Sequence, residues 1–185
     1  MDNLAGIIRN CKNCKLHKTR TNTVPGMGNP NSGVVFVGEA PGQWEDLKGI
    51  PFVGRAGKLL DEVLESFGIK RDSVFITNIV KCRPPKNRRP EKDEIEICTG
   101  YLDRQIEAIS PKVIAPLGAT AGEYICKKYG VPWTAMMKEN GQAKQINTVF
   151  GVLTIVPVIH PAAVLRNINN KHLLESAIEK IIELI

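Results

Sequence analysis

The sequence lacks any hydrophobic run long enough to cross a membrane. Its longest apolar run, Val152–Ile159, is interrupted by Thr154 and Pro157, and it falls far short of the ~20 residues that a spanning helix needs. The N-terminus has no basic segment followed by an apolar one, so we expect no signal peptide, no membrane partner and a cytoplasmic protein. Without export, the five cysteines favour metal binding or catalysis over disulfides.

Repeats, low-complexity tracts and interdomain linkers are also absent, and aromatic residues make up only 5% of the chain. The remaining composition is that of an ordinary globular protein, with 43% hydrophobic and 24% charged residues in a length of 185. This length suits one domain better than two. We therefore expect a single domain over residues 1–185 and a monomer.

Positive charge is concentrated in two segments of this chain, whose net charge is +6. Residues 9–20 hold five Lys or Arg and no acid, and residues 81–92 hold six against the single Glu91. Either segment alone is compatible with a solvated loop. Both contain cysteines, and a shared metal would join them into one positive patch suited to a phosphate backbone.

Short β-branched runs alternate with helical patterns along the chain. Strands are predicted at Val34–Val37, Val74–Val80, Val113–Leu117 and Val152–Ile159, with an uncertain one at Ala143–Phe150. Helices are predicted at residues 59–67, Ala119–Tyr129 and Leu173–Ile185, and another is predicted to begin just after Pro90 and to end at Ile109. This alternation indicates an α/β protein with a parallel sheet covered by helices on both faces, whose ligands bind beyond the carboxyl ends of the strands.

Four cysteines have the spacing of metal ligands. Cys11 and Cys14 form a pair with two residues between them, Cys82 follows the second predicted strand, and Cys98 lies on the next helix. The wide gap between Cys82 and Cys98 favours a cubane iron–sulfur cluster over zinc. The alternative is that Cys82 and Cys98 are merely small buried residues. Cys126 has no partner in this pattern, and we expect it in the core.

Polar and aromatic residues stand where the predicted strands end. Glu39 lies in the turn formed by residues 38–42, which lacks the Lys-Ser/Thr of a P-loop and so argues against ATP. Asn78 and His160 each end a strand, and Phe52 lies in a loop rich in Gly and Pro. Each of these residues also has a common structural role. The functional alternative is a ligand site in which Phe52 stacks on a planar base and Asn78 and His160 form hydrogen bonds.

Five motifs in order resemble the iron–sulfur uracil-DNA glycosylases called family 4: Cys11-x-x-Cys14, GEAPG (38–42), PFVGRAGKLLD (51–61), TNIVKCRPPKNRRP (77–90) and HPAAVLR (160–166). The likeness runs from about residue 5 to the end of the chain. It departs at Trp44 and Ile50, outside the core of any motif. The resemblance implies a three-layer αβα fold around a four-stranded parallel sheet, a 4Fe–4S cluster, and removal of uracil from DNA to leave an abasic site.

The resemblance also implies roles for individual residues. Phe52 resembles the ring that stacks on uracil, Asn78 the side chain that reads its edge, and His160 the donor to uracil O2. The pocket is further expected to be lined by Glu39 and by the backbone of Ala40 and Pro41. Two side chains are expected to complete the pocket or orient water: Glu45 and Asn87. The implied cluster ligands are Cys11, Cys14, Cys82 and Cys98.

The chemistry of such a reaction fits these residue types. Breaking an N-glycosidic bond separates a sugar cation from a uracil anion. The carboxylate of Glu39 is suited to stabilise the sugar cation, and a hydrogen bond from His160 is suited to stabilise the uracil anion. The base must leave the DNA stack, and a side chain must fill the opened space. The residues expected to contact DNA, as wedge or phosphate partners, are Arg88, Arg89, Leu165 and Arg166.

Two other interpretations remain open from the sequence. A non-catalytic nucleic-acid-binding module held by a metal explains the cysteines and the basic segments, but gives Glu39, Asn78 and His160 no common purpose. A glycosylase of the same superfamily with another base, such as hypoxanthine or mismatched thymine, explains all of them. Uracil-containing DNA, single- or double-stranded, is the partner that we expect.

Overall fold

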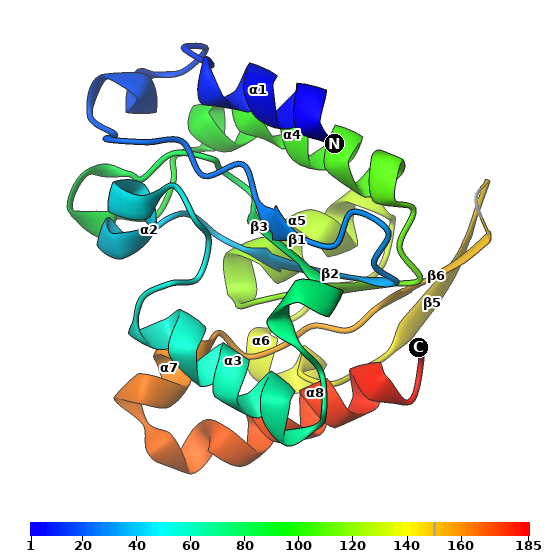
Figure 1. Ribbon diagram of the computed structural model, residues 1–185. Helices are drawn as coiled ribbons and strands as arrows, with labels where there is room; N and C mark the ends of the chain where they lie inside the picture. The colour runs from blue at the N-terminus through cyan, green and yellow to red at the C-terminus, as the bar shows by residue number, and fades with distance from the viewer. Residues whose placement is uncertain (150) are drawn as a thin grey trace.

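The protein is built around one mixed sheet, as seen in a computed structural model that describes residues 1–149 and 151–185. The strands are β1 (Met27–Gly28), β2 (Val34–Gly38), β3 (Phe75–Asn78), β4 (Val113–Pro116), β5 (Lys144–Thr148) and β6 (Gly151–Ile155). Their order in the sheet is β1-β3-β2-β4-β6-β5 (Figure 1). The four central strands run parallel, as predicted, and β1 and β5 are antiparallel at the two edges.

The expectation of a four-stranded sheet is therefore wrong, because the described sheet has six strands. Both additional strands lie at edges, where sequence patterns are weak. β1 has only two residues, and Gly26 and Gly28 beside and within it have positive φ values of 129° and 120°. β5 pairs with β6 from Lys144 opposite Ile155, and it occupies most of the uncertain strand predicted there. The last residue of that prediction, Phe150, lies outside the described residues.

Helices cover both faces of the sheet. They are α1 (Asp2–Arg9), α2 (Gln43–Lys48), α3 (Arg55–Ser66), α4 (Lys92–Ile109), α5 (Ala119–Lys128), α6 (Met136–Glu139), α7 (Pro161–Arg166) and α8 (Lys171–Ile182). Short 3₁₀ turns lie at Lys15–Lys18, Arg71–Ser73, Pro85–Asn87 and Ile168–Asn170. In the described part of the chain, no helix is both long and apolar enough to cross a bilayer.

The core has two halves, because successive residues of a strand point to opposite faces. Val34 and Phe36 of β2 pack in the cluster that holds the buried residues of α3 and α8. Val35 and Val37 pack in the cluster that holds those of α4 and α5. Figure 1 shows the same layers, with α4 above the sheet and α3 and α8 below it. All five residues of β2 are buried as a result.

The N-terminal segment lies along α4 rather than apart from the domain. α1 packs against α4, and its Leu4 and Ile8 are buried (Figure 1). After it, the Lys15 ammonium lies 2.5 Å from the Glu91 carboxylate, and Arg20 donates to the Cys82 sulfur at 3.0 Å. The two basic segments are thus neighbours, as the cysteine pattern predicted.

Candidate active site

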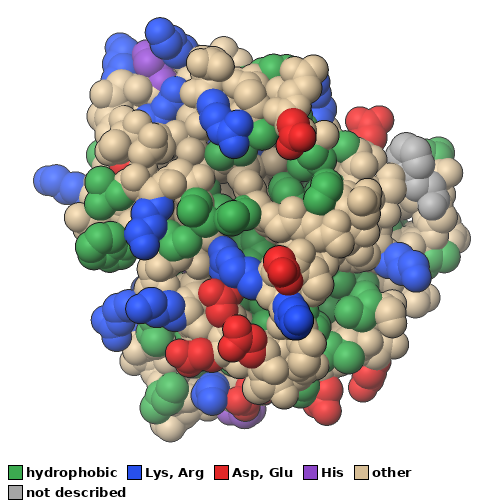
Figure 2. Space-filling view, in the orientation of Figure 1, with side chains coloured by type: hydrophobic (Ala, Val, Ile, Leu, Met, Phe, Trp, Pro, Cys, Tyr) green, Lys and Arg blue, Asp and Glu red, His purple; other side chains and the backbone are tan. Residues whose placement is uncertain are grey.

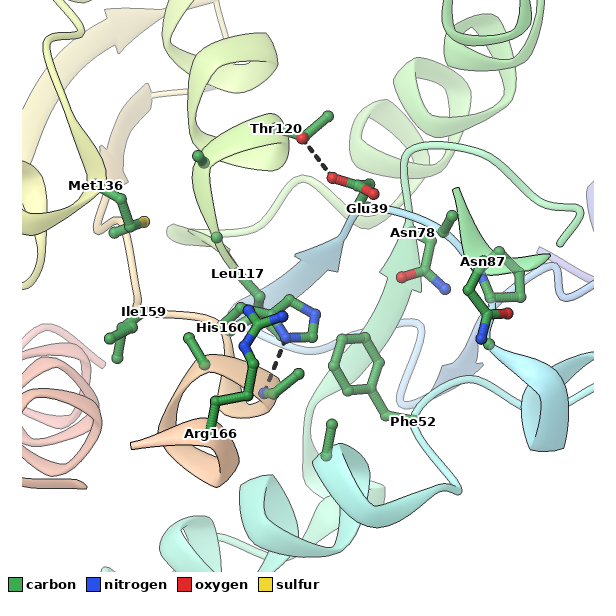
Figure 3. Close-up of a pocket in the computed structure, with 18 of the residues that line it drawn as sticks. Glu39, Phe52, Asn78, Asn87, Leu117, Thr120, Met136, Ile159, His160 and Arg166 are labelled. Atoms are coloured by element: carbon green, nitrogen blue, oxygen red, sulfur yellow. Dashed lines mark hydrogen bonds between the residues drawn. The ribbon is translucent and has the colours of Figure 1, made fainter. Parts of the chain in front are cut away.

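A cavity of about 780 Å³ opens at the carboxyl ends of the parallel strands, where the fold class predicts a ligand site. Figure 3 shows side chains from separate loops turned toward it. The predicted residues that line it are Glu39, Ala40, Pro41, Glu45, Phe52, Asn78, Asn87, Arg88, His160 and Arg166. The structure therefore brings the expected pocket residues to one place.

Phe52 is held in a strained backbone conformation at one wall of this cavity. Its φ is 50°, in the left-handed region that non-glycine residues rarely adopt. Its carbonyl oxygen accepts from the Arg71 guanidinium at 3.2 Å, and Arg71 also donates to the Pro51 carbonyl. The Phe52 carbonyl also lies close to α3 at Gly57, which only a glycine permits, since a Cβ there would lie 1.8 Å from the Phe52 oxygen. The loop thus fixes the ring by several independent contacts.

Glu45, expected to orient water or complete the pocket, also supports this loop. Its Oε1 accepts backbone N–H groups from Val53 at 3.0 Å and Gly54 at 2.9 Å. One carboxylate oxygen is therefore engaged in positioning the Phe52 loop. Glu45 remains on the cavity wall.

Asn78 presents an unpaired acceptor. Its side chain is only 1% exposed, yet among the described residues Oδ1 has no hydrogen-bond partner. Leaving a buried polar atom unpaired costs about 1–3 kcal/mol, so a ligand donor is the natural complement. Gly38 on the adjacent strand keeps the space open, because a Cβ there would lie 2.3 Å from that oxygen and 2.7 Å from the Phe52 ring.

Behind Asn78 lies Lys81, which the sequence did not single out for this site. Its ammonium is almost fully buried and donates to the Asn78 carbonyl at 2.6 Å, and to Thr77 Oγ1 and Gln105 Oε1, both at 2.7 Å. Burial lowers the pKa of Lys81 to about 7. A buried lysine among neutral acceptors is a signal that only the tertiary structure provides.

His160 is held as a neutral ring in one tautomer. Its Nδ1 accepts from the backbone N–H of Ala162 at 3.1 Å, where it caps the start of α7, so the ring proton lies on Nε2. Burial and, to a smaller extent, the Arg166 charge lower the pKa of His160 to about 4, against an opposing effect of Glu45. The ring lies 5.7 Å from that of Phe52, between centroids (Figure 3).

Glu39 is anchored by a residue from another strand end. The Thr120 hydroxyl, in the first turn of α5, donates to Glu39 Oε2, as the dashed line in Figure 3 shows. Thr120 is only 7% exposed and also lines the cavity. Sequence reasoning missed this residue, because a threonine at the start of a helix has no distinctive pattern.

Asn87 also lines the cavity, and it belongs to the segment that follows β3. Both Lys86 and Asn87 have positive φ values, 54° and 56°. The Asn87 Oδ1 accepts from Arg83 Nε at 2.7 Å. This hydrogen bond fixes the side chain that was expected to help orient water.

The two arginines expected to bind phosphate have different surroundings. Arg88 forms two hydrogen bonds to Glu94, at 2.8 and 2.6 Å, and the Glu94 side chain is fully buried. Arg89 pairs with Glu123 at 3.3 Å, and both of these side chains are more than half exposed. Arg88 is therefore tied into the start of α4, whereas Arg89 is accessible to a ligand.

The segment 160–166, which resembles a DNA-entering loop, is the short helix α7 after its cap His160. Pro161 favours the helix because its φ is preset and its missing N–H has no role at that position. Leu165 and Arg166 are both exposed, and Arg166 lines the cavity rim. Elsewhere on the surface, Figure 2 shows Lys and Arg gathered over the segment that follows α1.

The four candidate ligand cysteines lie in one neighbourhood. Burial raises the pKa of Cys98 to about 11 and also raises that of Cys82, and Cys14 adds to both shifts. Cys11 also raises the pKa of Cys82. Cys126 lies on α5 and is fully buried in the core, and the charges that act on its pKa are those of Lys144 and Glu139. Within residues 1–149 and 151–185, no three His, Cys, Asp or Glu side chains form a site for a single ion.

Comparison with known proteins identifies the family. The model of the Uracil DNA glycosylase superfamily matches residues 25–182. A Type-4 uracil-DNA glycosylase of Sulfurisphaera tokodaii is 48% identical over 188 residues, covering 100% of this chain and 86% of the relative. A Type-4 uracil-DNA glycosylase of Archaeoglobus fulgidus is 46% identical over 184 residues, covering 100% of this chain and 92% of the relative. With the cavity and its motif residues in the expected arrangement, the chain belongs to the uracil-DNA glycosylase superfamily, in its type-4 family.

Proposed function

We propose that this protein removes uracil from DNA by hydrolysing its N-glycosidic bond, which leaves an abasic site. The observation that carries the proposal is the pairing of an unpartnered buried acceptor, Asn78 Oδ1, with a neutral donor, His160 Nε2, around one cavity. The names of the relatives support the same activity.

Uracil matches this arrangement edge by edge. Its N3–H donates to Asn78 Oδ1, its O4 accepts from the Asn78 amide, and its O2 accepts from His160 Nε2. The Phe52 ring stacks on its face. Cytosine has a donor at N4 and an acceptor at N3, so it meets Asn78 with two mismatched contacts that cost about 1–3 kcal/mol each.

Bond cleavage then depends on charges that develop in the transition state. The Glu39 carboxylate stabilises the sugar cation, and its oxygen that does not bind Thr120 is left to orient the attacking water. His160 stabilises the departing uracil anion by donating a hydrogen bond as a neutral imidazole. Glu45 and Asn87 shape the pocket through the contacts that they make to its loops.

The uracil base reaches the cavity by flipping out of the DNA stack. Leu165 on α7 fills the gap that the uracil leaves in the stack, and Arg166 holds the adjacent phosphate. Arg89 adds a phosphate contact by exchanging its exposed partner Glu123 for DNA.

Cys11, Cys14, Cys82 and Cys98 are the residues that would hold a 4Fe–4S cluster, and the cluster would then join the N-terminal segment to α4. The donor set fits: four thiols from three segments lie together, and backbone N–H groups point at two sulfurs, from Lys81 to Cys98 at 3.2 Å and from Asn13 to Cys11 at 3.5 Å. Zinc needs all of its ligands ~2.3 Å from one point, whereas thiolates of a cubane bind separate irons and lie farther apart. When bound, the cluster supplies structural cross-linking.

Metal analysis tests this assignment. We expect brown protein with about four irons per chain when it is purified without air. The Cys126→Ser variant is the matched control and should keep the colour, because the charged groups that act on Cys126 are Lys144 and Glu139 and not the four candidate ligands. Stoichiometric zinc without iron would contradict the cluster.

Excision assays on oligonucleotides that carry one uracil test the activity. Alkali cleaves the strand where a base has been removed, and parallel substrates with hypoxanthine or a mismatched thymine test the other base choices. The Asn78→Asp variant should excise uracil more slowly, since a carboxylate has no donor for O4, and it should narrow the ratio of uracil to cytosine rates. An unchanged ratio means that another group reads the base.

A further inference from the structure

Base reading by Asn78 requires that its amide be held in one orientation. A half-turn of the amide exchanges its donor and acceptor and makes it complementary to cytosine. Within the described chain, Asn78 Oδ1 has no partner to prevent this turn. The amide turns about its own Cβ–Cγ bond, which the backbone does not restrain, but the place from which the amide reaches the base is set by the backbone that carries the side chain.

Lys81 supplies a contact to that backbone. Its ammonium donates to the Asn78 carbonyl oxygen at 2.6 Å, and to Thr77 Oγ1 and Gln105 Oε1 at 2.7 Å. The Thr77 hydroxyl and the Gln105 amide both donate to the Pro25 carbonyl, at 3.0 and 2.6 Å, so their oxygens face Lys81 as acceptors. Three hydrogens thus meet three acceptors, in a setting where an unmatched polar atom is costly.

The Asn78 carbonyl depends on this donor because the sheet offers it none. The backbone N–H of Ile79 donates toward β2, to Gly38, so the Asn78 carbonyl points to the other side of β3. The neighbour on that side is β1, which pairs only with Phe75 and Ile76 and ends before Asn78. Without Lys81, the carbonyl would be buried and unpaired, and the bond from the Ile79 N–H to Gly38 would alone hold the peptide after Asn78.

Lys81 also connects this strand end to α4. Its backbone N–H donates to the Cys98 sulfur at 3.2 Å, and Gln105 lies on the same helix. We propose that Lys81 is a positioning residue that fixes the base-reading Asn78 against α4, and that it thereby determines the discrimination of uracil from cytosine. This inference rests on the proposed function and adds a specificity determinant to it.

The Lys81→Met variant tests the inference, because Met keeps most of the side-chain length and removes all three donors. Lys144→Met is the matched control: Lys144 also donates to a backbone carbonyl, that of Pro132 at 2.6 Å, but it lies on β5 away from the base-reading strand end. Iron content and thermal unfolding report on the fold of each variant. Two further readouts are the inhibition constant of free uracil and the ratio of single-turnover rates on uracil and cytosine.

We expect Lys81→Met to bind free uracil about tenfold more weakly, the loss typical of one neutral hydrogen bond between Asn78 and the base, and to narrow the uracil-to-cytosine rate ratio similarly. Lys144→Met should change neither quantity. A folded Lys81→Met protein with both values of the wild type overturns the inference.

If that variant does not fold, Gln105→Met, which removes one acceptor from Lys81, is decisive in the same way: a narrowed ratio of uracil to cytosine rates supports the inference and an unchanged ratio overturns it. A wild-type protein inactive on uracil refutes the proposed function itself, whereas an active wild type with indifferent variants refutes only this inference.

Discussion

Lowering the pH tests whether His160 works as a neutral donor. Burial and the nearby Arg166 hold its pKa at about 4, against 6.5 for an unperturbed imidazole. Between these values the unfolded chain binds a proton that the folded protein does not, so the free energy of unfolding falls as the pH drops. This contribution is fully present above pH 6.5 and is lost by pH 4. At about 1.4 kcal/mol per pH unit, the whole loss amounts to about 3 kcal/mol, and about 2 kcal/mol of it occurs by pH 5.

The assay compares the wild type with His160→Gln, whose amide does not titrate in this range. Thermal unfolding at pH 7.5 and pH 5.0 should show a larger loss of stability in the wild type than in the variant. The imidazole resonances of His160 should stay unchanged over the same interval, and the single-turnover rate should not follow a titration near pH 6.5. A His160 titration near pH 6.5, or equal losses of stability in both proteins, would refute the neutral-donor reasoning.

Two further predictions concern neighbouring charges and anchors. Arg89→Gln should weaken DNA binding equally for all sequences and reduce its salt slope by about one, which salt titrations measure. Arg88→Gln should mainly destabilise the fold, by about 1–3 kcal/mol in thermal unfolding, because the buried Glu94 loses two hydrogen bonds and keeps only the Glu91 N–H and the more distant Lys15. The reverse pattern would contradict the assignment. Thr120→Val should slow single-turnover excision about tenfold by removing one hydrogen bond to Glu39, whereas Thr120→Ser keeps that bond and the rate. In a Glu39→Gln background the Val substitution should have a much smaller effect, and equal effects in both backgrounds would show that Thr120 acts elsewhere.

Much of the central sheet could be predicted because its signals are local. The run at 34–37 is apolar at every position, which is typical of a strand covered on both faces, and the structure buries all of β2. The apolar stripe near the C-terminus likewise predicted α8. The edge strands β1 and β5 were missed or uncertain, because β1 has two residues and β5 is only half-buried. Neither has the burial on both faces that leaves a clear pattern.

The chemistry available to this protein follows from its residue types and their order along the chain. The residue types and order of Glu39, Asn78 and His160 at predicted strand ends indicate the family, together with Phe52 in its loop and the four spaced cysteines. Parallel strands place their carboxyl ends at one edge of the sheet, so those residues had to converge.

The hydrogen-bond partners and pKa values of these groups depend on how the chain packs. The hydrogen bond from Thr120 to Glu39 and the contact of Lys81 with Gln105 each join segments that are far apart in the sequence. The same holds for the pKa of His160, since burial is a property of the whole fold. Residue identity fixes which protons and lone pairs exist, but their partners and solvation are set by neighbours that are distant in the sequence.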